Sequence, residues 1–290
     1  MELKDNGMGF NPAIAQNQIE TAILDTQKVM AACGMTAFHD NNVRSVEDIK
    51  TYQQMTRDGL LYLRNDLYLT LEWPSDLDKV AQVKPMDNDV TRFAGYKFLI
   101  DGQGPTSYCH QPHTGVEYRR PTWDPEQFKS TIKDLHDTGL QSCTHCIGDA
   151  AADLTLDAYE GAQNANPRSD PRHRIEHAIL TTPDATRRMR DLSVAVCTQP
   201  AFIYLFGDGW ETLFGTERMD RIVVTREWLD AGVHVSISSD APSTPLYYPQ
   251  ATLAGAISRY SNKEKTIGAD QSLTFTEALR AHTIEGAYAG

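Results

Sequence analysis

One structural unit recurs along the chain: a stretch with helical periodicity, a glycine, and then a short apolar stretch typical of a strand. The unit occupies residues 26–40, 49–73, 128–149 and 224–240. The junction residue is a glycine able to take the left-handed conformation that ends helices: Gly34, Gly59, Gly139 and Gly232. Strands that alternate with helices at this spacing indicate an α/β fold with a parallel sheet, as a barrel or doubly wound.

The number of strands bears on which parallel sheet the chain forms. Seven strand regions begin near Met35, Leu67, Tyr96, Leu140, Arg174, Val194 and Val233. A (β/α)8 barrel has eight, so a barrel made from residues 1–290 is expected to be incomplete, as one domain that lacks the first strand. No glycine-rich phosphate loop of the dinucleotide type follows a strand, which disfavours nucleotide binding.

Composition narrows the function classes. The net charge is −12 and the basic residues are scattered, which disfavours a nucleic-acid groove or an anionic membrane surface. No apolar run approaches the ~20 residues that span a bilayer, and the first ten residues contain no signal-peptide core. Five widely spread cysteines indicate reduced thiols and a cytoplasmic location. The expected partner is a small-molecule substrate, and homo-oligomer formation stays open.

The segment from Gly232 to Pro245, GVHVSISSDAPSTP, alternates strictly between apolar and polar residues. In a parallel barrel the β-branched face of such a strand packs on helices and the other face lines the interior. Asp240 then stands at the carboxyl end of the strand, where these barrels keep their active sites. We predict a catalytic or metal-binding carboxylate at Asp240; the alternative is a helix cap or turn former before Pro242.

Lys97 lies in the apolar strand GYKFLID, where alternation places it on one face with Leu99 and Asp101. A lysine inside such a strand is costly unless it is paired or modified. It is therefore a candidate metal-site residue, and an ion pair with a neighbouring carboxylate is the structural alternative.

Two histidines occupy similar strand positions. Alternation in LQSCTHCIGDAA places His145 on one face with Gln141 and Cys143, while Asp149 begins the next helix as a cap or a support for the site. The cysteines of the C-x-x-C run face opposite ways in a strand, so a redox or zinc-ribbon role is disfavoured.

His177 ends the strand RHRIEHAIL. Ile175 and His177 are expected to share a face, with Glu176 pointing away toward an arginine or lysine on a helix. A lone histidine on an apolar strand is usually a satisfied core residue. Two histidines and an aspartate at the carboxyl ends of separate strands favour a shared site.

Imidazole nitrogens and carboxylate oxygens suit zinc or a similar divalent ion. Such an ion lowers the pKa of a bound water to ~7, and a nearby aspartate can move the proton to a leaving amine. The residues therefore indicate metal-assisted hydrolysis.

Four segments together resemble the metal-dependent amidohydrolase superfamily: HCIGDAAADLTLDAYE, RHRIEHA, SSDAPSTPLYYPQATLAGAISR and LTFTEALRAHTIEGAYA. They are most similar to its YtcJ-like branch (amidohydrolase family 3), which includes N-substituted formamide deformylases. The resemblance spans about Gln18 to Gly290 and implies a (β/α)8 barrel with one or two metal ions. It implies that His145 and His177 are metal ligands, that Lys97 is a bridging lysine, carbamylated where two ions are held, and that Asp240 is a ligand and general base.

The chain departs from the family pattern in two respects. No two of its nine histidines are separated by a single residue, so the first-strand His-x-His pair of the family is absent from this sequence. Sequence for the family's accessory β-sandwich is also absent, so the chain resembles an amidohydrolase shortened at both ends.

Three functions follow as hypotheses. The first is a metal-dependent hydrolase of an amide or formamide-like C–N bond, with its substrate set by residues 101–124 and 202–214. The second is an inactive barrel that acts as a scaffold or assembly partner. The third is a metal-free lyase in which Lys97 forms a Schiff base.

Overall fold

A computed structural model describes residues 16–113, 115 and 120–290; the amino-terminal stretch and part of the 101–124 loop lie outside the described residues. Its sheet contains seven strands: β1 (Ala37–Val43), β2 (Arg64–Leu71), β3 (Thr91–Leu99), β4 (Gln141–Cys146), β5 (Arg174–His177), β6 (Ala195–Thr198) and β7 (Val235–Ile237). All neighbouring pairs are parallel and follow chain order. Each predicted strand region holds one strand, so the α/β barrel-type sheet is confirmed.

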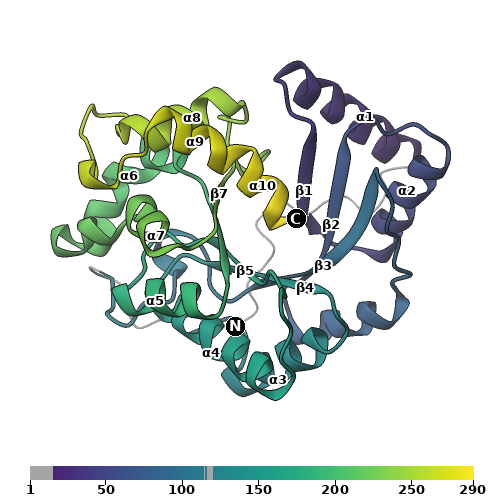
Figure 1. Cartoon of the computed structure of the whole chain (residues 1–290), viewed down its shortest axis with the longest axis horizontal. Coiled ribbons are helices and arrows are strands. Elements are labelled where there is room, and N and C mark those ends of the chain that lie inside the picture. Colours follow the sequence, from purple (N-terminus) through teal and green to yellow (C-terminus); the bar gives the residue numbers. More distant parts are fainter. Residues whose placement is uncertain (1–15, 114, 116–119) are drawn as a thin grey trace.

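Helices connect the strands and cover the outside of the curled sheet (Figure 1). They are α1 (Gln16–Ala32), α2 (Val46–Arg57), α3 (Pro125–His136), α4 (Asp149–Ala165), α5 (Pro183–Asp191), α6 (Ala201–Phe214), α7 (Thr225–Ala231), α8 (Pro249–Ser258), α9 (Phe275–His282) and α10 (Ile284–Ala289). The four predicted junction glycines have positive φ values of 84°, 69°, 85° and 85° in chain order. The stretch 202–214, expected to help set the substrate, lies in the helix α6. No helix in the described part of the chain is long and apolar enough to cross a membrane.

The sheet curls like part of a barrel but stays open. Within the described residues β1 and β7 do not pair with each other. Figure 1 shows that α10 lies between these two strands and ends beside β1. The helix thus occupies the gap that a further strand would fill in a closed barrel.

The two faces of the sheet have different contents. Tyr96, Phe98 and Ile100 of the β3 segment pack into the large apolar core between the sheet and the helices. On the inner face, Tyr68, Ala94 and Cys143 form a small separate cluster. The predicted alternation of β3 is therefore confirmed, and Lys97 lies on the inner face.

Candidate metal and active site

Lys97 is 6% exposed on the inner face of β3. Its charge acts on Glu176, His145 and His177. Within the described ranges the structure gives it neither a hydrogen bond nor an ion pair, so the predicted structural alternative is not formed there. An amine in this position is open to modification or to a ligand.

His145 is the last residue but one of β4 and is buried beside His177, with ring centroids 4.4 Å apart in an edge-to-face arrangement. Its Nε2 atom is buried and has no hydrogen-bond partner. Burial, with smaller effects from His177 and Lys97, holds the pKa of His145 well below its usual range. The ring is therefore neutral at pH 7, and its Nε2 atom, which makes no hydrogen bond, is of the kind that binds a divalent ion.

Two consecutive residues at the end of β5 have positive φ values: His177 at 72° and Ala178 at 49°. The turn directs the His177 ring toward His145, whereas Ile175 packs in the outer core. The predicted shared face of Ile175 and His177 is therefore wrong, because a left-handed residue interrupts strand alternation. Such strain persists where surrounding contacts enforce it, often at functional sites.

Two neighbours orient the His177 ring. Nδ1 is 2.7 Å from Oε1 of Gln199, and Phe202 of α6 stacks on the ring at 6.1 Å. Burial and the charge of Lys97 lower the pKa of His177 below its usual value. Since the Gln199 oxygen accepts the Nδ1 proton, the Nε2 lone pair of a neutral ring is available to a ligand.

Glu176 differs from its prediction. It points inward and pairs with Arg174 of its own strand rather than with a basic residue on a helix, because the polar face of β5 lines the interior. Burial raises the pKa of Glu176, but the charges of Arg174 and Lys97 outweigh this effect and bring it to about 2. Glu176 is therefore an anion, opposite His145 in the ladder and next to His177 in the chain.

Asp240 lies three residues beyond β7, with a positive φ of 55°. Its charge raises the pKa of His177, so the two side chains interact electrostatically. Its carbonyl oxygen accepts a bond from the Ser243 amide at 2.9 Å, which forms a turn. Asp240 thus fills the predicted turn position, and its charge acts on His177; its role as a ligand and base stays a prediction.

The predicted ligands are brought together only in part. His145 and His177 are in contact, with Lys97 and Asp240 within electrostatic range. Among the described residues, no three His, Cys, Asp or Glu side chains are grouped closely enough to hold a metal ion. The unpartnered His145 nitrogen and the neutral His177 ring fit a divalent ion as two of its ligands. Lys97 and Asp240 stay predictions as the others.

Asp101 is a residue whose role the sequence reasoning missed. The Asp101 carboxylate accepts hydrogen bonds from the backbone amides of Tyr108, Ile147 and Gly148, at 2.9, 3.0 and 2.9 Å. Its Oδ1 lies 3.6 Å from Nε2 of His145, and burial raises its pKa to about 7. Its position after β3, on the Lys97 face, was the available signal. It fastens the end of β4 and the long loop beside the site.

The other predicted features are structural. Cys143 faces the interior and Cys146 the outer core, so the two cysteines of the C-x-x-C run face opposite ways, as predicted. Asp149 is the first residue of α4, and its Oδ1 accepts the His110 amide at 3.0 Å. It therefore attaches the long loop to the start of the helix.

His173 and His136 form a buried relay at the opposite end of the sheet. The Ser142 amide donates to Nδ1 of His173 at 3.0 Å, so His173 carries its proton on Nε2 and donates to Nδ1 of His136 at 2.8 Å. Nε2 of His136 then donates to the Asn166 carbonyl at 2.8 Å. All four ring nitrogens make hydrogen bonds, so His173 has no free lone pair to bind a further proton.

This relay predicts an acid-sensitive contribution to stability. Burial, with the charges of His136 and Arg168, lowers the pKa of His173 well below 6.5. The unfolded chain therefore binds the proton first, and stability is full above pH 6.5 and falls as the pH drops below it. We expect His173→Gln to remove up to about 1.4 kcal/mol per pH unit from the acid slope of the unfolding free energy in urea. His110→Gln is the surface control, and equal slopes for His173→Gln and the unmodified chain would contradict the prediction.

Sequence comparison relates this chain to known proteins. A model described as the Amidohydrolase family matches residues 3–290. The chain is 29% identical over 223 residues to the N-substituted formamide deformylase of Arthrobacter pascens, which covers 73% of this chain and 39% of that protein. It is 23% identical over 287 residues to YtcJ of Bacillus subtilis, which is named as an amidohydrolase, covering 94% of this chain and 52% of YtcJ.

A solved structure shares the fold. An uncharacterized metal-dependent hydrolase from Pyrococcus horikoshii OT3 superposes with a TM-score of 0.82 at 23% identity, covering 96% of this chain and 56% of that one. The chain spans less than two thirds of each of these three relatives. The family match and these similarities confirm the resemblance that the four sequence segments indicated.

Proposed function

This chain belongs to the amidohydrolase family, and we propose that it hydrolyses an amide or formamide-like C–N bond with a divalent metal ion. The observation that carries the proposal is the pair of neutral imidazoles, one with an unpartnered nitrogen, at the carboxyl ends of β4 and β5. Similarity to the Arthrobacter pascens deformylase supports N-substituted formamides as the substrate class. Compartment and domain organisation are also proposals: a single domain, in the cytoplasm, where its five free cysteines stay reduced.

The proposed ligands are His145, His177, Lys97 and Asp240, with Lys97 carbamylated if two ions bind. Zinc is the expected metal because it favours imidazole nitrogen and carboxylate oxygen. When bound, a divalent ion acidifies water and polarises the carbonyl of the substrate.

The protein's own groups carry the proton. Asp240 accepts a proton from the attacking water on a carboxylate oxygen as the new C–O bond forms. It then delivers that proton to the nitrogen as the C–N bond breaks, giving a carboxylic acid and an amine. Gln199 and Phe202 keep the His177 ring in place.

A panel of N-substituted formamides and simple amides tests the proposal. We expect release of acid and amine in equal amounts, loss of turnover after removal of metal with a chelator, and recovery on addition of zinc. Hydrolysis that is unaffected by the chelator would contradict the metal-dependent mechanism.

One observation favours the scaffold alternative: the absence of a three-donor metal cluster from the described part of the chain. A scaffold would bind no stoichiometric metal and hydrolyse nothing. The same panel, together with metal analysis, separates the two functions.

A further inference from the structure

Arg174 is the most extensively bonded charged side chain inside the sheet. It is fully buried at 0% exposure, and its guanidinium lies over the Tyr68 ring, 4.7 Å from the centroid. A buried cation is tolerated only where its donors are satisfied. Its partners come from three separate elements, β5, β1 and α10, so Arg174 links parts of the fold that are far apart in sequence.

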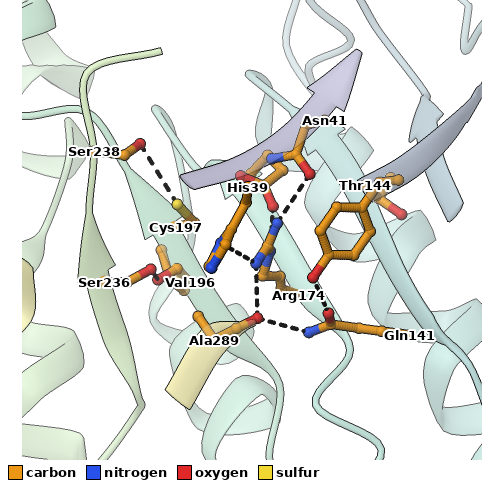
Figure 2. A network of polar contacts seen from close by, with 12 residues as sticks. His39, Asn41, Gln141, Thr144, Arg174, Val196, Cys197, Ser236, Ser238 and Ala289 are labelled. Atoms are coloured by element: carbon orange, nitrogen blue, oxygen red, sulfur yellow. Dashed lines mark hydrogen bonds and ion pairs between the residues drawn. The ribbon is translucent and has the colours of Figure 1, made fainter. Parts of the chain in front are cut away.

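Figure 2 shows the links to β1 and α10. Nη2 donates to Oδ1 of Asn41 at 3.0 Å, and Nη1 lies 2.9 Å from Nδ1 of His39. Nη1 also donates to the carbonyl oxygen of Ala289 at 2.7 Å, which Gln141 shares at 3.0 Å. Arg174 therefore connects β1 to α10, the helix that lies between β1 and β7, where no backbone ladder exists among the described residues.

The last helix is also held from outside. Tyr288 of α10 lies between two side chains, stacked on His234 at 4.0 Å and under the Arg172 guanidinium at 4.5 Å. Its hydroxyl donates to Asp170 at 3.1 Å. This contact fixes the helix end that presents the Ala289 carbonyl to Arg174.

On its other side Arg174 reaches the candidate site. Nε donates to Oε1 of Glu176. Glu176 is opposite His145 in the β4–β5 ladder and precedes His177 in the chain, and its charge acts on His177. Hydrogen bonds thus run from α10 through Arg174 to Glu176, and Glu176 acts on the histidine pair through its place in the ladder and its charge.

We propose that Arg174 is a positioning residue that transmits the docking of α10 to the His145–His177 pair through Glu176. The proposal rests on the proposed function, because it concerns the same histidine pair. It can still be tested separately, since the positions of the two rings can be measured in the metal-free protein. Residues that orient metal ligands from behind typically change metal affinity 10–100-fold when replaced.

Three variants test this inference, read out by the ring-nitrogen NMR signals of His145 and His177 in the metal-free protein. Arg174→Met should shift both signals, and Arg174→Lys should partly restore them. Tyr288→Leu, which loosens α10 from outside without touching the interior, should shift them in the same direction. This half-exposed position keeps the test valid if Arg174→Met does not fold.

Arg259→Met is the matched control. Arg259 is equally buried and donates to the backbone carbonyls of Ile222, Val223 and Ile267, away from the site. It should lower stability and leave the histidine signals unchanged. Unchanged signals in both Arg174→Met and Tyr288→Leu, or equal shifts in Arg259→Met, would overturn the proposal.

Cobalt binding then separates this inference from the proposed function. If the unmodified chain binds Co²⁺, Arg174→Met should weaken binding about 10–100-fold and alter the visible absorption of the bound ion, while Arg259→Met should not. If the unmodified chain binds none, the proposed metal function fails, and the NMR signals alone decide whether Arg174 positions the histidines.

Discussion

Replacing Asp240 by asparagine is expected to lower kcat/KM for C–N hydrolysis by about 10²–10⁴-fold, the usual contribution of general acid–base catalysis. The amide cannot accept and return the proton that links water attack to amine departure. Asparagine is the suitable replacement because Asp240 has a positive φ of 55°, which asparagine tolerates better than most residues.

The measurement is steady-state turnover of the best substrate of the panel, with thermal unfolding as a check on folding. Asp157→Asn, on the exposed side of α4, is the matched control and should keep full activity. An Asp240→Asn protein that turns over at the rate of the unmodified chain would leave Asp240 only its turn-forming role.

Replacing both His145 and His177 by alanine is expected to abolish metal binding and hydrolysis together. Their rings are the two neutral donors in contact, and the buried Nε2 of His145 makes no hydrogen bond to lose. The variant should therefore retain its fold. Its stability should be lower, because the removed rings leave a cavity in the interior. His136 and His173 stay in place as a second histidine pair in the same protein.

Metal content per folded chain, by elemental analysis after dialysis, is the measurement. If the variant binds as much metal per chain as the unmodified protein, the ion is bound elsewhere and not at the ends of β4 and β5.

Local patterns predicted the sheet well. Helix, glycine and strand repeat in the sequence, and each repeat became a parallel strand, because glycine stops and apolar alternation act within a few residues. The same alternation placed Lys97 and His145 on the inner face correctly.

The prediction failed where backbone conformation or distant contacts decide. His177 turns toward His145 through a positive φ that no glycine announces. Glu176 has its partner two residues away because Arg174 is held inside by Ala289, 115 residues distant along the chain. Asp101 bonds to three backbone amides that only the folded chain brings together. These contacts surround the site, so its supporting residues were less predictable than its candidate ligands.

The most direct test of the central claim is the metal content of the purified 290-residue chain, produced with zinc in the medium and compared with the His145→Ala/His177→Ala protein. We predict stoichiometric divalent metal in the unmodified chain and none in the variant. No metal in either protein, or equal metal in both, would contradict a metal site built on His145 and His177.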